Sequence, residues 1–185
     1  MRLSKYFSFV FLPMKTAGGS SRPGTNVFLF WSGHGARNKV LKWADENLEA
    51  ETFRGILEAA QGNYRKMLAV METCYSGSIG TYCEGLPGVL LLCSASSGET
   101  SHADVMEDGI YLSNRFTRVF RSQVEANPAI SLHDLYYQLA THTTASHAGL
   151  YNQRCLLREH LSQHAGRVPE AVRRMRAGLL GILGP

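Results

Sequence analysis

Three short apolar runs, each followed by glycine or polar residues, constrain the fold of this chain most strongly. They occupy residues 26–31, 67–71 and 88–93. Runs of this length without polar alternation are typical of strands that are buried on both faces. Between the first two runs, residues 48–61 carry apolar side chains at helical spacing, with Asn47 as a candidate N-cap and Gly62 after the end. Strands that alternate with helices predict an α/β fold, with a mostly parallel sheet and helices on both of its faces.

Two further helices are predicted downstream of the third run. One spans 110–126 and ends at Asn127, because the residue before a proline disfavours helix. Ser131 is the predicted N-cap of the other, with Asp134 at its third helical position. The segment 94–109 between the strands and these helices is predicted to be a mostly polar loop.

Composition and charge exclude several classes of function. The chain has 185 residues, 44% of them hydrophobic, which is typical of one globular domain, and it holds no run of eighteen apolar residues. The net charge of +4 comes entirely from residues 150–185, which carry six Arg and two Glu. A neutral body attracts phosphate weakly, so a nucleic-acid partner is not expected. Four cysteines without a C-x-x-C pair do not predict a zinc site.

The two ends of the chain differ in character from its middle. Residues 1–25 form a leader or linker with a basic start, an apolar stretch and small residues, the parts of a signal peptide. Pro13 and Lys15 lie where a signal peptide should have small, uncharged residues for cleavage, so a strand followed by a linker is the favoured alternative. Only the signal-peptide interpretation predicts secretion. The catalytic unit is predicted over 26–152.

Residues 153–185 are predicted to form a basic helical tail. One apolar helix face is predicted there, with four arginines near it, and such a helix can lie on a membrane or a partner protein. The face comprises Ala171, Val172, Met175, Leu179 and Leu180, and the arginines are Arg167, Arg173, Arg174 and Arg176. The favoured alternative is an ordinary terminal helix or a poorly ordered tail.

Two chemically reactive side chains follow the first two predicted strands. His34 comes three residues after position 31, and Cys74 three residues after position 71. In a right-handed βαβ unit, both carboxyl ends lie at the same edge of the sheet, where such sheets bind ligands. A histidine there can accept the thiol proton. Taken singly, Cys74 is more simply a buried thiol and His34 a loop residue, but their paired placement favours a catalytic dyad.

Glycine residues flank the candidate histidine and support the same chemistry. Gly33 and Gly35 carry no side chain, so a substrate backbone can approach closely. The N–H groups of Gly35 and Cys74 are candidate donors to an oxyanion. These parts predict acyl transfer through a thioester, which needs no metal ion or organic cofactor.

The residues Ser-Gly-His-Gly at 32–35, followed some forty residues later by Glu-Thr-Cys-Tyr-Ser-Gly-Ser at 72–78, resemble the caspase-like clan of cysteine peptidases. Within that clan the sequence is most similar to the legumain family, the asparaginyl endopeptidases. Residues 94–101 and 142–147 also resemble legumains, and the similarity extends over about residues 24–152. Glycosylphosphatidylinositol transamidase catalytic subunits share the family and look more distant.

The resemblance implies a caspase-like fold and a role for particular residues. It implies His34 as general base, Cys74 as nucleophile, and the N–H groups of Gly35 and Cys74 as the oxyanion hole. In legumains an acidic residue two positions before the cysteine lines the pocket for the residue before the cut, which matches Glu72. A hydroxyl residue of the same pocket matches Thr100, with Ser101 beside it. The alternatives are a cap or ion pair for Glu72 and a turn-capping hydroxyl for Thr100.

The sequence departs from the legumain pattern in two places. Legumains carry an acidic residue in the stretch that matches 111–114, where this chain has Asn114. An amide cannot hold the same charge pattern, which puts strict selectivity for Asn or Asp in doubt. Legumains also begin with a strand and a helix that supply a pocket arginine and a residue that orients the histidine. Residues 1–25 do not match them, so the chain resembles an N-terminally truncated member with an exposed sheet edge.

Three hypotheses follow for function. The first is a legumain-like cysteine endopeptidase that binds peptide or protein substrates in extended conformation and cleaves after Asn or Asp. The second is a transamidase or peptide ligase of the same family, because an amine can resolve the thioester in place of water. The third is a catalytically incompetent homologue or an interaction module that binds through residues 153–185.

Overall fold

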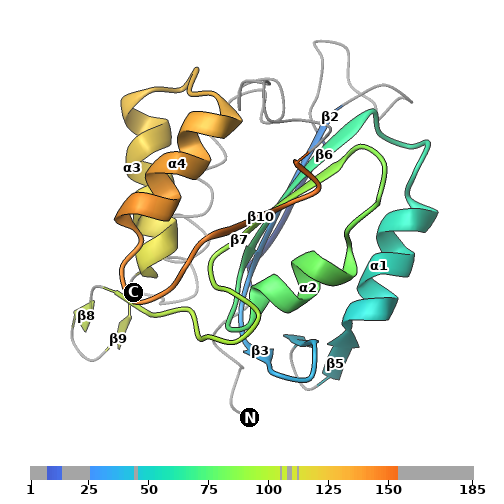
Figure 1. Ribbon diagram of the computed structural model, residues 1–185, viewed down its shortest axis with the longest axis horizontal. Coiled ribbons are helices and arrows are strands. Elements are labelled where there is room, and N and C mark those ends of the chain that lie inside the picture. The colour runs from blue at the N-terminus through green and yellow to red at the C-terminus, as the bar shows by residue number, and fades with distance from the viewer. Residues whose placement is uncertain are drawn as a thin grey trace, which may run out of the picture.

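A five-stranded sheet forms the centre of the computed structural model, which describes residues 8–13, 26–43, 46–104, 106–107, 110–111 and 113–153 (Figure 1). In spatial order the strands are β1 (Ser8–Pro13), β2 (Asn26–Ser32), β6 (Lys66–Glu72), β7 (Val89–Cys93) and β10 (Gly149–Tyr151). The three central strands are parallel, and the two edge strands run antiparallel to them. All three apolar runs are therefore confirmed as strands.

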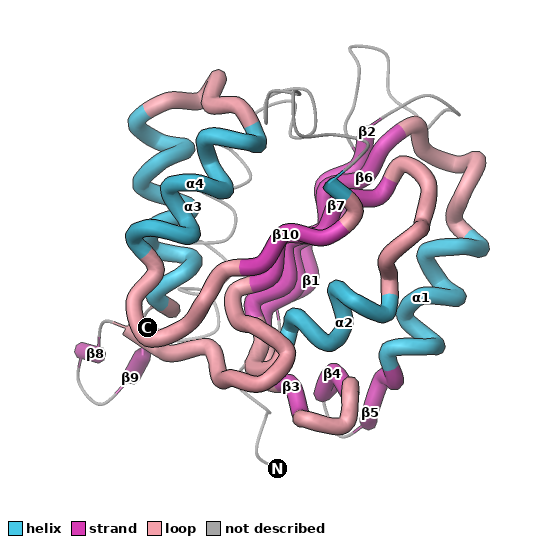
Figure 2. The backbone as a smooth tube through the Cα atoms, viewed as in Figure 1, coloured by secondary structure: helices cyan, strands magenta, loops and turns pink. Residues whose placement is uncertain are grey.

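Helices cover both faces of this sheet (Figure 2). One face packs on α1 (Ala50–Ala59) and α2 (Ser76–Tyr82), and the other on α3 (Arg115–Ala126) and α4 (Leu132–His142). Alternate residues of β2 enter the two cores: Phe28 and Phe30 lie on the α3–α4 side, and Val27, Leu29 and Trp31 on the α1–α2 side. A strand buried on both faces needs apolar residues at every position. The predicted α/β class, with helices on both faces, is confirmed.

The helix predicted over 48–61 begins two residues later than expected. Residues 46–49 form β5 (Glu46–Glu49), which pairs with β4 (Val40–Trp43), and β3 (Gly35–Ala36) completes a small antiparallel sheet. Asn47 accepts a hydrogen bond from Lys42 Nζ at 2.7 Å, and Glu49 occupies the N-cap position of α1. The prediction that Asn47 caps this helix was therefore wrong, because strand pairing uses the residue.

The helix predicted over 110–126 begins at Arg115, so its predicted start was wrong. Residues 110–111 form β9 (Ile110–Tyr111), paired with β8 (Met106–Glu107) inside the predicted loop. The N–H of Asp104 donates to the Ser113 carbonyl at 2.7 Å, and that of Arg115 to the His102 carbonyl at 3.0 Å. These bonds to the preceding loop hold the backbone extended up to residue 114.

The start of α4 agrees with the prediction. Ser131 is its N-cap, and the Ser131 hydroxyl oxygen accepts a hydrogen bond from the Asp134 N–H at 3.0 Å. The hydroxyl also donates to the Asp134 carboxylate at 2.7 Å. This contact satisfies one of the N–H groups that a helix start leaves without a partner.

A strand near the N-terminus covers the outer edge of β2. β1 pairs antiparallel with β2 along its length, from Ser8 opposite Ser32 to Pro13 opposite Val27. The β2 edge that was expected to be exposed is therefore covered, and that expectation was wrong. The rest of segment 1–25 and the predicted tail after residue 153 lie outside the described residues. Within the described part of the chain, no helix has the length and apolar content to cross a membrane.

Candidate active site

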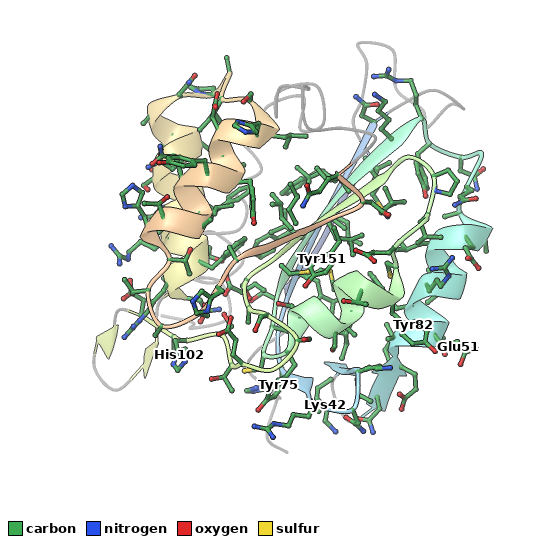
Figure 3. The ribbon with its side chains drawn as sticks, viewed as in Figure 1. Lys42, Glu51, Tyr75, Tyr82, His102 and Tyr151 are labelled. Atoms are coloured by element: carbon green, nitrogen blue, oxygen red, sulfur yellow. The ribbon has the colours of Figure 1, made fainter. Side chains whose placement is uncertain are left out.

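The loops that follow β2 and β6 meet at the carboxyl edge of the sheet. The strand register places Ser32 opposite Glu72, and the Gly33 N–H donates to the Glu72 carbonyl at 3.1 Å. His34 follows as an exposed residue. Figure 3 labels Tyr75, Lys42 and His102, which mark this edge of the molecule. The histidine loop and the Cys74 loop therefore lie side by side, as the order of strand, helix and strand in the sequence predicted.

Gly35 lies directly against the backbone of Cys74. A Cβ atom at position 35 would overlap the Cys74 carbonyl oxygen and lie 2.9 Å from Thr73 Oγ1. The Lys42 N–H donates to the His34 carbonyl at 2.9 Å, so His34 and Lys42 form a hydrogen-bonded pair of the β3–β4 ladder. In an antiparallel ladder the next position is a non-hydrogen-bonded one, so the Gly35 N–H points away from β4.

Cys74 is partly exposed at the start of a sharp turn. Its thiol contacts the Ser101 carbonyl oxygen, with Sγ at 3.6 Å. The next residue, Tyr75, has a φ of 58° and its N–H donates to the Glu99 carbonyl at 2.8 Å. A left-handed backbone is uncommon for tyrosine, and such residues concentrate at functional sites. The turn ends β6 and starts α2 at Ser76.

The other two described cysteines are poor candidates for a nucleophile. Cys83 and Cys93 are free thiols buried in the α1–α2 core. Burial raises the pKa of Cys83 to about 11 and raises that of Cys93 as well. A buried thiol with a raised pKa is neutral and unreactive near neutral pH. Among the described cysteines, Cys74 is the one that a substrate can reach.

Glu72 is buried between the Ser101 loop and α3. Its side chain is 1% exposed. Oε1 accepts a hydrogen bond from the Ser101 hydroxyl at 2.9 Å, and Oε2 accepts one from the Thr117 hydroxyl. Burial raises the pKa of Glu72 to about 7, and the two hydroxyl contacts keep it from rising further. Both carboxyl oxygens thus have protein partners.

The remaining predicted site residues, Thr100 and Asn114, lie on the 99–104 loop and at the start of α3. Thr100 Oγ1 lies 3.1 Å from His102 Nε2. Asn114 pairs with Ala103 as an isolated antiparallel bridge and occupies the N-cap position of α3 without a side-chain cap bond. The structure therefore joins Ser101 to both Glu72 and Cys74, while the Thr100 side chain contacts His102.

Two residues of this region were not predicted from the sequence. One is Thr117, which contacts Glu72 from α3. The other is Glu99, whose carboxylate accepts hydrogen bonds from the Ser96 N–H at 2.8 Å and the His147 N–H at 2.5 Å, and lies 2.9 Å from His147 Nδ1. Partial burial alone raises the pKa of Glu99, but the bonds from His147 and Ser96 outweigh it and lower the pKa to about 2.

The signals for these two residues differ. Glu99 and its partner His147 lie in the two stretches, 94–101 and 142–147, that resemble legumains. The resemblance therefore covered both residues but assigned neither of them a role. Thr117 is a polar residue on a helix, and no local pattern identifies its partner. Within the described residues, no group of three or more His, Cys, Asp or Glu side chains could hold a metal ion.

The arrangement supplies the parts of a thiol-based acyl transfer. An accessible thiol stands at the edge of the sheet, and a histidine stands on the adjoining loop. The Gly35 N–H points away from its ladder beside the Cys74 backbone. Such a site can form and resolve a thioester if the substrate carbonyl lies between thiol and N–H donors.

The chain is similar in sequence to several known proteins. Legumain from Mus musculus is 27% identical over 154 residues, which cover 79% of this chain and 35% of that protein. GPI-anchor transamidase from Saccharomyces cerevisiae is 26% identical over 135 residues, covering 68% of this chain and 32% of that protein. Vacuolar-processing enzyme from Citrus sinensis is 33% identical over 110 residues, covering 54% and 22%.

The chain spans about a third of the length of the curated legumains that it matches. The model of the Peptidase C13 family matches residues 15–167, which include both the His34 loop and the Cys74 loop. With a match over most of its length and the expected fold, this chain belongs to the Peptidase C13 family.

Proposed function

We propose that this chain is a legumain-like cysteine endopeptidase in which Cys74 is the nucleophile and His34 the general base. The observation that carries the proposal is the junction of the two loops, where Gly35 packs against the Cys74 backbone. This contact supports a shared site for the histidine loop, the thiol and the Gly35 N–H. Family membership supports the same reaction class.

The proposed reaction has two steps. In the first, the Cys74 sulfur attacks the scissile carbonyl carbon while His34 takes the thiol proton, and the N–H groups of Gly35 and Cys74 stabilise the oxyanion. The C–N bond then breaks, the amine leaves with the proton from His34, and a thioester remains on Cys74. In the second step, His34 removes a proton from water, which attacks the thioester and releases the acid.

The proposed preference for the residue before the cut is Asn or Asp, held near Thr100, Ser101 and Asn114. Because Glu72 is buried and Asn114 is uncharged, this part of the site offers the substrate hydroxyl and amide groups in place of a free carboxylate. Hydroxyl and amide groups hydrogen-bond an amide or a protonated acid. Of the two substrate side chains, Asn fits these hydroxyl and amide groups better than Asp.

A transamidase or ligase is the second candidate, and the similarity to GPI-anchor transamidase favours it. The thioester and the residues that form it are the same in both reactions. Only the group that resolves the thioester differs: water in the peptidase and an amine in the transamidase.

The test is hydrolysis of fluorogenic peptides with Asn, Asp, Arg, Lys or Ala before the reporter, under reducing conditions. The wild-type chain is compared with Cys74→Ala and with Cys83→Ala as the matched control, because Cys83 is a buried thiol. The proposal expects cleavage by the wild type and by Cys83→Ala, strongest after Asn, and none by Cys74→Ala.

An added peptide with a free α-amino group separates the two candidate functions, because an ordinary amine competes poorly with water unless the enzyme binds it. A ligated product that exceeds the free acid identifies a transamidase or ligase, and a dominant acid product identifies a peptidase. Absence of both products from folded wild-type protein, or their undiminished formation by Cys74→Ala, would refute the proposed function.

A further inference from the structure

A continuous set of contacts joins helix α3 to the Cys74 thiol. The Thr117 hydroxyl donates a hydrogen bond to Oε2 of Glu72. The Ser101 hydroxyl donates one to Oε1 of Glu72 at 2.9 Å. The Ser101 carbonyl then lies 3.6 Å from Cys74 Sγ. Three separate segments, α3, the end of β6 and the 99–104 loop, thus meet beside the thiol.

Burial makes the Glu72 end of this set rigid. At 1% exposure the carboxyl group has no access to bulk solvent, so each oxygen needs a protein partner. Thr117 supplies the partner for one oxygen, which leaves the other directed at Ser101. The Thr117 N–H also bonds to Glu72, and that bond stays when only the hydroxyl is removed. Without the hydroxyl the carboxyl group keeps a single bond from Thr117 and can turn about it, which disturbs its contact with Ser101.

The contact between Ser101 and Cys74 affects the thiol directly. A hydrogen bond from a thiol to a carbonyl favours the neutral thiol over the thiolate and fixes the direction of the sulfur. We propose that Thr117 is a positioning residue for Cys74. Through Glu72, Thr117 holds the Ser101 carbonyl in the position where this carbonyl accepts a hydrogen bond from the resting thiol. The proposal rests on the proposed function for its catalytic meaning, but it concerns a property of the thiol itself.

Other charged and titratable groups lie on the elements around this set. They include His34 on the loop after β2, Tyr75 after Cys74, Glu99, His102 and Asp104 on the 99–104 loop, and Arg115, Arg118, Arg121 and Glu125 on α3. Arg118 forms an ion pair with Asp104. None of these residues changes in the variants used below, so a difference between variants reports on the hydroxyl contacts.

The experiment measures the rate at which iodoacetamide alkylates Cys74 from pH 4 to pH 9, with the modified residue mapped by mass spectrometry. Thr117→Val removes the hydroxyl and keeps the shape, and Thr117→Ser is the conservative variant. The buried thiols Cys83 and Cys93 serve as internal references in the same samples. Since one neutral hydrogen bond is lost, Thr117→Val is expected to raise the Cys74 rate below neutral pH about two- to tenfold. Thr117→Ser is expected to match the wild type.

Ser101→Ala provides a second approach, because it removes the same contact from the loop side and keeps the carbonyl. It is expected to reproduce the Thr117→Val profile, and it decides the question if Thr117→Val does not fold. A wild-type profile in either folded variant, or an equal change in Thr117→Ser and Thr117→Val, would overturn the proposal. Alkylation does not require turnover, so this result is independent of whether the peptides above are cleaved.

Discussion

Gly35 occupies the tightest position of the candidate site. A Cβ atom there would overlap the Cys74 carbonyl oxygen, which is backbone and cannot rotate away. Gly35→Ala is therefore expected to lower stability by about 1–3 kcal/mol, as overpacking does, and to lower kcat/KM at least about tenfold by displacing the Cys74 turn. Urea unfolding and peptide hydrolysis measure the two effects.

Gly55→Ala is the matched control, because Gly55 lies within α1 and an added Cβ meets nothing within 4 Å. It is expected to stabilise the protein by about 0.5–1 kcal/mol without affecting activity. Gly35→Ala with wild-type activity would show that the close contact has no catalytic importance.

Glu72 gives a stability that depends on pH between about 4.5 and 7. Its pKa in the folded state is about 7, above the ordinary value of 4.5, because burial disfavours the charged form. The folded state therefore binds the proton more tightly than the unfolded state, so its contribution is full below pH 4.5 and is lost as the pH rises through 7. The loss amounts to about 3 kcal/mol.

Glu72→Gln has no proton to lose, so its free energy of unfolding should fall less between pH 4.5 and pH 8 than that of the wild type. Urea unfolding at both pH values measures the difference. Equal losses in the two proteins would contradict the assignment of this pH dependence to Glu72.

Glu99 is expected to make stability depend on pH in the opposite direction to Glu72, and over a lower pH range. The hydrogen bonds from His147 and Ser96, acting against burial, lower its pKa to about 2, below the ordinary value of 4.5. Its stabilising contribution is therefore present above pH 4.5 and is lost as the pH falls toward 2. Thermal unfolding of Glu99→Gln should depend less on pH over that range than unfolding of the wild type. A parallel pH dependence in the two proteins would refute this.

At the scale of elements, the N-cap of α4 offers a clean test of a local contact. The Ser131 hydroxyl oxygen accepts from the Asp134 N–H, whereas Glu49, the N-cap of α1, makes no side-chain cap bond. Ser131→Ala is therefore expected to cost about 1 kcal/mol of stability. Glu49→Ala should change it by less than about 0.5 kcal/mol. Chemical denaturation distinguishes these values, and equal effects would contradict the capping role.

Elements whose burial is fixed by local pattern were predictable from the sequence. The runs that became β2, β6 and β7 are apolar at every position because both faces are covered. Ser131 was predictable because an N-cap involves residues three apart. Likewise, the sequence order of strand, helix and strand was sufficient to place His34 and Cys74 on adjoining loops.

Elements that depend on pairing between distant residues were not predictable. Residues 46–49 carry no strong strand pattern and become β5 because β4 lies beside them. The start of α3 is set by hydrogen bonds from the 102–104 loop. Thr117 contacts a carboxyl group 45 positions away in the chain, so no local signal could identify it.

At the scale of the whole molecule, the candidate site lies where the two layers of helices meet the edge of the sheet. The turn after Cys74 leads into α2 on one face, and Thr117 reaches Glu72 from α3 on the other. The β1 strand covers the outer edge of β2, the strand that ends at the His34 loop. Both helical layers thus contact the segments that flank the Cys74 thiol.

Capture of an acyl-enzyme on Cys74 would test directly whether this thiol is the nucleophile. A peptide ester with Asn at the reacting carbonyl is mixed with the wild type, Cys74→Ala or His34→Ala, quenched in acid within seconds and analysed by mass spectrometry. A thioester is expected on the peptide that contains Cys74, with none in Cys74→Ala and formation at least about 100-fold slower in His34→Ala. An adduct on another cysteine, no adduct in folded wild-type protein, or an undiminished rate in His34→Ala would contradict this assignment.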